Sequence, residues 1–127
     1  MGRHYSGDIQ GKFMFAVQSS TDASNFGGYE LALEHDYVRY IFTENHKEEI
    51  GNGIEICLAE LGDYKQDIDQ FFVENEYYND EALADYLEIL DKKKVKELLV
   101  QYARLRLGLQ IKDCVDKNGR CEFLTEQ

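Results

Sequence analysis

Side chains able to bind a small ligand gather near the N-terminus, around a predicted first strand. They are Tyr5, Asp8, Gln18, Ser20 and Asn25, and they lie close to Gly7, Gly11, Gly27 and Gly28. Glycines let a ligand approach the backbone closely, and a helix N-terminus offers amide donors to an anion. The functional interpretation is a ligand pocket or an enzyme site. The competing and favoured interpretation is that these side chains satisfy their own turn and cap amides.

Metal and cofactor chemistry has no clear pattern in the chain. His4, His35 and His46 lack the i, i+4 or Cys-x-x-Cys spacing typical of zinc sites, and no Walker or Gly-x-Gly-x-x-Gly run is present. We therefore predict no metal, no cofactor and no catalytic residue. The cysteine count of three is odd, which favours reduced thiols, although a Cys114–Cys121 bridge across a turn is geometrically conceivable.

Carboxylates are concentrated in the middle of the chain. Residues 30–91 carry 18 Asp and Glu against three Lys and Arg, a net charge of −15, whereas residues 92–127 have a net charge of +4. Two sets at helical spacing stand out, and they are Asp63, Asp67 and Glu74, then Glu81, Asp85 and Glu88. Such sets could imitate the phosphates of a nucleic acid toward a basic protein groove. Alternatively, they form a solvated surface or dock on the lysines of 92–96.

Composition restricts the other classes of function. The only cluster of cations, Lys92 to Lys96, is short and adjoins the acidic block, so direct nucleic-acid binding is not expected. No apolar run reaches the length of about 18 residues needed for a membrane span, and the start of the chain lacks the apolar stretch of a secretory signal. We expect a cytoplasmic protein with no membrane contact. Its oligomeric state does not follow from the sequence.

Strand patterns occur in three parts of the chain. Lys12–Gln18 alternates as a half-buried strand, and one helical turn is expected between residues 19 and 28. The segments Tyr29–Glu34 and Tyr37–Thr43 predict a hairpin whose Val38, Tyr40 and Phe42 share a face. Arg120–Glu126 alternates again, so a last strand is expected to join the N-terminal part of the sheet.

Helical periods fill the middle of the sequence. A helix from Glu44 is predicted to end at Gly62, although Gly51 and Gly53 inside it each cost about 1 kcal/mol relative to Ala. Asp63 is expected to cap a second helix, Asn79 or Asp80 a third, and Asp91 the longest, which Asn118-Gly119 ends. The predicted class is α+β, in one domain over residues 1–127. A small, mainly antiparallel sheet combines an N-terminal strand, the middle hairpin and a C-terminal strand under three to four helices.

Three segments carry a resemblance. The opening His4–Ser20, together with Tyr102–Gly108 and Cys114–Phe123, resembles small uncharacterised proteins of phages and large DNA viruses. This resemblance implies no catalytic residue and no substrate. It does imply a viral context, which favours a host-directed binder or inhibitor over a metabolic enzyme. We therefore hypothesise a non-enzymatic acidic protein that engages a basic partner, with a ligand-binding domain or enzyme at the first strand as the alternative.

Overall fold

The computed structural model describes residues 4–12, 21–33, 37–75 and 80–126. Its strands form one five-stranded sheet in the order β2-β1-β5-β4-β3, and every neighbouring pair is antiparallel. The strands are β1 (His4–Gly7), β2 (Gly11–Lys12), β3 (Tyr29–Leu33), β4 (Tyr37–Thr43) and β5 (Arg120–Glu126). The helices are α1 (Lys47–Leu61), α2 (Tyr64–Glu74), α3 (Asp80–Leu87) and α4 (Lys92–Asn118), with the short 3-10 helices η1 (Asp22–Phe26) and η2 (Glu44–His46). The predicted α+β class is confirmed.

The last strand brings the two ends of the chain together, as the sequence predicts. β5 pairs with β1 on one side, where Tyr5 lies opposite Thr125, and with β4 on the other. The β3–β4 hairpin is also confirmed, with Tyr29 opposite Ile41. The predicted strand Lys12–Gln18 lies outside the described residues beyond position 12. β1 was not predicted, because its sequence has one buried apolar residue among polar ones.

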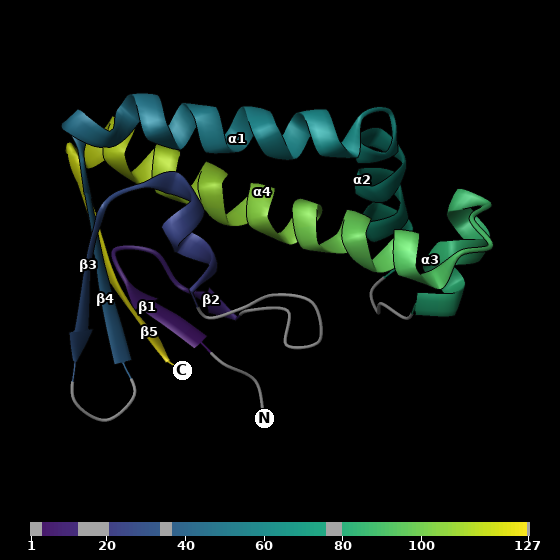
Figure 1. The fold of residues 1–127 in the computed structure, drawn as a ribbon, viewed down its shortest axis with the longest axis horizontal. Coiled ribbons are helices and arrows are strands. Elements are labelled where there is room, and N and C mark those ends of the chain that lie inside the picture. Colours follow the sequence, from purple (N-terminus) through teal and green to yellow (C-terminus); the bar gives the residue numbers. More distant parts are fainter. Residues whose placement is uncertain (1–3, 13–20, 34–36, 76–79, 127) are drawn as a thin grey trace.

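One face of the sheet carries the core. Val38, Tyr40 and Phe42 of β4 all point to this face and are buried, as their alternation predicts. The rings of Phe42 and Phe123 stack with centroids 6.1 Å apart, and Tyr40 stacks on Phe123 at 5.7 Å. This aromatic layer of the sheet is covered by η1, α1 and α4 (Figure 1).

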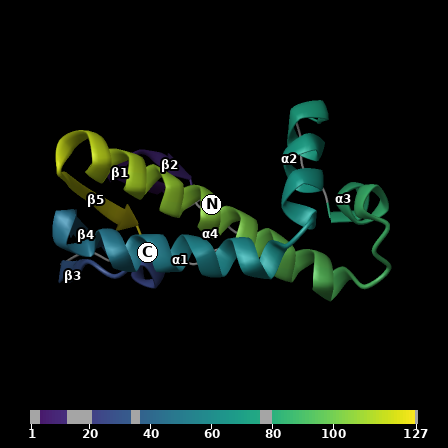
Figure 2. The ribbon, with the colours of Figure 1, turned by 90° about the horizontal axis from the view of Figure 1, so that it is seen from above.

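α1 and α4 lie side by side and run in opposite directions above the sheet (Figures 1 and 2). Phe26 of η1 is fully buried beneath them, against Gly53 of α1 and Gly108 of α4. A Cβ atom at either glycine would come within 2.6 Å of the Phe26 ring. The sequence suggests only that Gly53 lowers the stability of the helix. The structure shows that its missing side chain also makes room for the Phe26 ring. A Cβ atom at Gly51, by contrast, would meet no described residue within 4 Å outside its own stretch of α1.

Three of the predicted signals at the helix ends are confirmed, whereas the helix predicted from Glu44 begins as the 3-10 helix η2, with α1 starting at Lys47. Gly62 ends α1, Gly119 ends α4 in the left-handed conformation, and the Asp91 carboxylate accepts a hydrogen bond from the Lys93 amide. Asp63 precedes α2, but its side chain makes no capping hydrogen bond, so that prediction was wrong. Its backbone is already helical (φ −67°, ψ −20°), whereas a capping side chain requires an extended backbone.

The molecule is elongated, with the sheet at one end and α2 and α3 at the other (Figure 1). α2 stands away from the α1–α4 pair when the molecule is seen from above (Figure 2). We call α2, α3 and the residues that flank them, 62–90, the acidic hairpin. They hold nine Asp and Glu against Lys65 alone, a net charge of −8.

Candidate interaction surface

Aromatic rings attach the acidic hairpin to the long helix α4. Phe71 of α2 is buried and meets Tyr86 of α3 edge to face, with centroids 5.5 Å apart. Next to it, Phe72 stacks on Tyr102 of α4 at 5.6 Å. Offset and edge-to-face contacts of this kind add to the burial energy of each ring. The apolar side of the hairpin is thus held against α4, and its carboxylates face solvent.

The one cation of the hairpin is already engaged. Lys65 Nζ lies 2.7 Å from Asp69 Oδ2, and the Tyr102 hydroxyl donates to Asp69 Oδ1 at 2.7 Å. Burial and the bond to this carboxylate raise the pKa of Tyr102 to about 12. Partial burial opposes any fall in the pKa of Asp69, but the hydrogen bonds from Lys65 and Tyr102 outweigh it and lower that pKa. Lys65 therefore neutralises Asp69, which is not one of the predicted partner-binding acids.

The predicted partner-binding acids are all exposed. They are Asp63, Asp67, Glu74, Glu81, Asp85 and Glu88. Four of them lie on α2 or α3, whereas Asp63 precedes α2 and Glu88 follows α3 with a positive φ of 58°. The strict helical spacing assumed from the sequence holds only within the helices, since the chain turns after Leu87.

Tyr86 of α3 lies close to two acids of α2. The pKa of its hydroxyl is raised by lost hydration, by the nearby Glu74 and Asp67 carboxylates, and by a hydrogen bond with Glu74. Glu74 also accepts a hydrogen bond from Gln70 at 3.0 Å. Two predicted partner-binding acids of α2 thus lie beside a side chain of α3.

Among the described residues, docking of this surface onto the lysines of 92–96 is limited to one pair. Lys92 Nζ lies 3.7 Å from Glu81, and both side chains are at least 70% exposed, so this pair contributes little. Within the described part of the chain, Lys93, Lys94 and Lys96 form no ion pair with an acid of the hairpin. Most of the negative charge is thus available to a partner.

Apolar side chains are also exposed on the acidic hairpin, and the sequence analysis missed them. Val73 is 79% exposed on α2, Leu90 is fully exposed after α3, and Tyr86 is 40% exposed. Protein interfaces combine aromatic and aliphatic side chains with a polar rim. The helical period could have predicted the exposure of Val73, because it places this residue off the buried stripe of Ile68 and Phe71.

The alternative ligand-binding residues do not converge where they are described. Tyr5 is buried and donates to Gln110 Oε1 at 2.6 Å, while Asn25 donates to the Asp22 carbonyl at 2.7 Å. Asp8 accepts from the Glu122 amide at 2.9 Å. Gln18 and Ser20 lie outside the described residues. Each described member of this group therefore satisfies a nearby partner.

A shallow depression of about 380 Å³ does lie beside Asp8. It is bordered by Arg39 and Glu122, whose side chains pair at 3.5 Å, and neither Tyr5 nor Asn25 reaches it. In the part of the chain that the structure describes, no group of three or more His, Cys, Asp and Glu side chains could hold a metal. None of the described helices is long and apolar enough to cross a membrane.

The cysteines are free thiols and are buried. Burial raises the pKa of Cys57 to about 11, and burial together with the Cys114 thiol raises that of Cys121. Because the thiolate is the nucleophile, we expect the native protein to resist iodoacetamide at pH 8 and the unfolded protein to react at all three thiols. Mass spectrometry after a timed reaction measures this. Rapid stoichiometric labelling of the native protein would contradict it.

Comparisons with family models, with curated proteins and with solved structures found no match for the chain. The resemblance to phage and viral proteins therefore stays a prediction.

Proposed function

We propose that the protein is a non-enzymatic interaction protein whose acidic hairpin engages a basic partner, and that it competes with nucleic acid for this partner. The supporting observation is the exposed carboxylate surface of α2 and α3, where, among the described residues, only Asp69 and Glu81 pair with a cation, Lys65 and Lys92 respectively. We place this activity in the cytoplasm, that of a host cell if the chain is viral. It needs no cofactor.

Charge and shape together support this assignment. The acidic hairpin carries −8 of the total charge of −11 and lies at one end of the molecule, where a partner groove can reach it (Figure 1). A basic groove that binds phosphates presents clustered Lys and Arg, and carboxylates can take the place of those phosphates. The exposed Val73 and Leu90 supply apolar contacts that a purely solubilising surface does not need.

Charge reversal tests the proposal. The double variant Asp67→Lys with Asp85→Lys changes one acid on each helix, and both side chains are exposed, so folding should be retained. Tagged protein is used to recover partners from cell lysate at about 50 and about 300 mM salt, because screening weakens exposed charge pairs. We expect the native chain to retain a nucleic-acid-binding protein at low salt and to release it at high salt. The variant should bind this partner with an affinity at least about tenfold lower.

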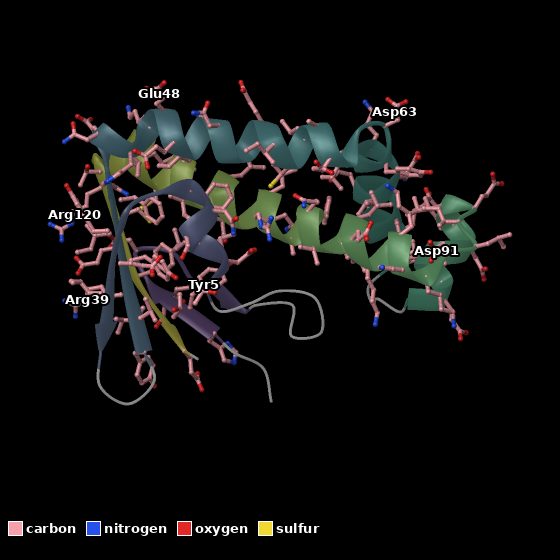
Figure 3. All side chains as sticks on the ribbon, in the orientation of Figure 1. Tyr5, Arg39, Glu48, Asp63, Asp91 and Arg120 are labelled. Carbon is pink, nitrogen blue, oxygen red and sulfur yellow. The ribbon has the colours of Figure 1, made fainter. Side chains whose placement is uncertain are left out.

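A matched control separates the hairpin from overall charge. Glu48→Lys with Glu55→Lys makes the same change in net charge on α1, and Glu48 lies far from Asp63 (Figure 3). This control should bind like the native chain. Displacement of a labelled oligonucleotide from the recovered partner tests the competition directly. Equal weakening by both variants, or no weakening by either, would overturn the proposal.

A further inference from the structure

A pocket of about 260 Å³ lies where the first turn of α1 meets the last turns of α4. We call it the α1–α4 pocket, and it is lined by Lys47 and Ile50 of α1 and by Lys112, Val115 and Asp116 of α4. These parts of the two helices lie at the end of the molecule that carries the sheet, opposite the acidic hairpin (Figure 1). The pocket is therefore separate from the surface proposed above to bind a basic partner.

The floor of the pocket is apolar. Ile50 and Val115 line it, and both belong to the hydrophobic core at 1% exposure each. Binding sites for small molecules combine such apolar walls with a few polar groups that fix the orientation of the ligand. At about 30 Å³ for each water molecule, the volume corresponds to roughly nine waters. A ligand of about that many non-hydrogen atoms, with an apolar part, would fill it.

Two ammonium groups from different helices share one carboxylate at the rim. Lys112 Nζ donates to Asp116 Oδ2 at 2.7 Å, and Lys47 Nζ lies 3.6 Å from Asp116 Oδ1. The hydrogen bond between Lys112 and Asp116 is the main cause that lowers the pKa of Asp116 and raises that of Lys112. Both groups are therefore charged at neutral pH. The lining of the pocket carries a net charge of +1 in a chain whose net charge is −11.

This arrangement of charges favours an anion over a cation. An ammonium group has three donors, so Lys112 can bind Asp116 and still donate to a ligand. A second carboxylate in the pocket would give each lysine a carboxylate of its own, and hydrogen bonds between charged groups are strong. An amine would instead bring a third positive charge to a single carboxylate. An inorganic anion would satisfy the lysines but leave the apolar floor uncovered.

We propose that the α1–α4 pocket binds a small carboxylate with a short apolar chain. The carboxylate contacts the ammonium groups of Lys47 and Lys112, and the apolar chain lies on Ile50 and Val115. Since roughly nine atoms fill the volume, the ligand is a free small molecule and not a segment of a protein. This binding does not depend on the function proposed for the acidic hairpin.

Titration of the full chain with acetate, butyrate and hexanoate tests the proposal, with the amide signals followed by NMR. Each pair of added methylene groups that reaches the floor should strengthen binding by about tenfold, and the amides of the pocket should shift most. Hexylamine and hexanol have the same chain without the anion, and they should bind at least about tenfold more weakly than hexanoate. Affinity independent of chain length, or equal binding of hexylamine, would overturn the proposal.

Substitutions at the rim should change the affinity for hexanoate in opposite directions. Lys112→Met removes the surplus charge and should weaken binding by about tenfold, whereas Asp116→Asn leaves both ammonium groups to the ligand and should strengthen it. Lys117→Met and Lys96→Met are matched controls, since each also removes one cation from α4. Lys117 pairs with Asp113, and Lys96 lies near the other end of the helix. Both controls should bind like the native chain. Equal weakening by Lys112→Met and the controls, or weaker binding by Asp116→Asn, would show that the pocket does not recognise the carboxylate.

Discussion

Replacing Arg104 with Met should lower the free energy of unfolding by about 3 kcal/mol. Arg104 Nε lies 2.8 Å from Asp22 Oδ1, and Asp22 is only 4% exposed. Removal of the guanidinium takes the Arg104 countercharge away from a buried carboxylate, and the bond that Asn25 donates to the same oxygen is longer, at 3.2 Å. Urea unfolding followed by circular dichroism measures the change, because urea does not screen charges.

Two further variants separate this ion pair from a general loss of charge. Lys112→Met also removes one cation from α4, but its pair with Asp116 is exposed, so we expect little change. Asp22→Asn should cost less than Arg104→Met, because the Arg104 side chain is 24% exposed and can be hydrated, whereas that of Asp22 is 3% exposed. If Arg104→Met and Lys112→Met lowered the free energy of unfolding equally, the burial of Asp22 would not explain the effect of its ion pair.

The same ion pair attaches the N-terminal part of the chain to α4, which also holds the acidic hairpin. Asp22 begins η1, and Arg104 lies on α4 two residues after Tyr102, which holds α2 through Asp69 and Phe72. α4 therefore serves as a common support for the sheet end and for the hairpin. A change that loosens α4 should affect both ends, which is why each binding test above includes a variant distant from its site.

Local signals were sufficient for much of the fold. Alternation predicted β4 and β5, Gly62 and Gly119 marked two helix ends, and Asp91 marked the start of α4. Each of these depends on side chains within a few positions, so the chain needs no tertiary information to reveal them. The net charge of the hairpin was equally readable, since charged side chains in excess of their countercharges must stay in solvent.

The remaining features depend on residues that are distant in the sequence. Asp22 and Arg104 are 82 positions apart, and β1 is a strand because β5 pairs with it. The sequence also could not show that Tyr86 sits among the acids of α2, because that contact requires the hairpin to close. The roles of Gly53 and Gly108 depend on Phe26 in the same way.

Replacing Gly108 with Ala should lower the free energy of unfolding by about 2 kcal/mol, even though Ala is the better helix former. The added Cβ atom would lie 2.5 Å from the Phe26 ring, and Phe26 is fully buried. Combining Gly108→Ala with Phe26→Leu should cost less than the sum of the two single changes, because the smaller side chain makes room for the methyl group. Urea unfolding of all four proteins gives this coupling energy.

Gly51→Ala provides the opposite expectation on the same helix pair. Apart from its own stretch of α1, none of the described residues has an atom within 4 Å of a Cβ built at Gly51, so the substitution should raise the free energy of unfolding by up to about 1 kcal/mol. Gly53→Ala, only two positions later, should behave like Gly108→Ala, since its Cβ would lie 2.6 Å from Phe26. Opposite signs at Gly51 and Gly53 cannot come from helix propensity, which is the same at both positions. Opposite signs require the Phe26 ring to lie between α1 and α4. If Gly51→Ala, Gly53→Ala and Gly108→Ala all raised the free energy of unfolding, the ring would not lie there.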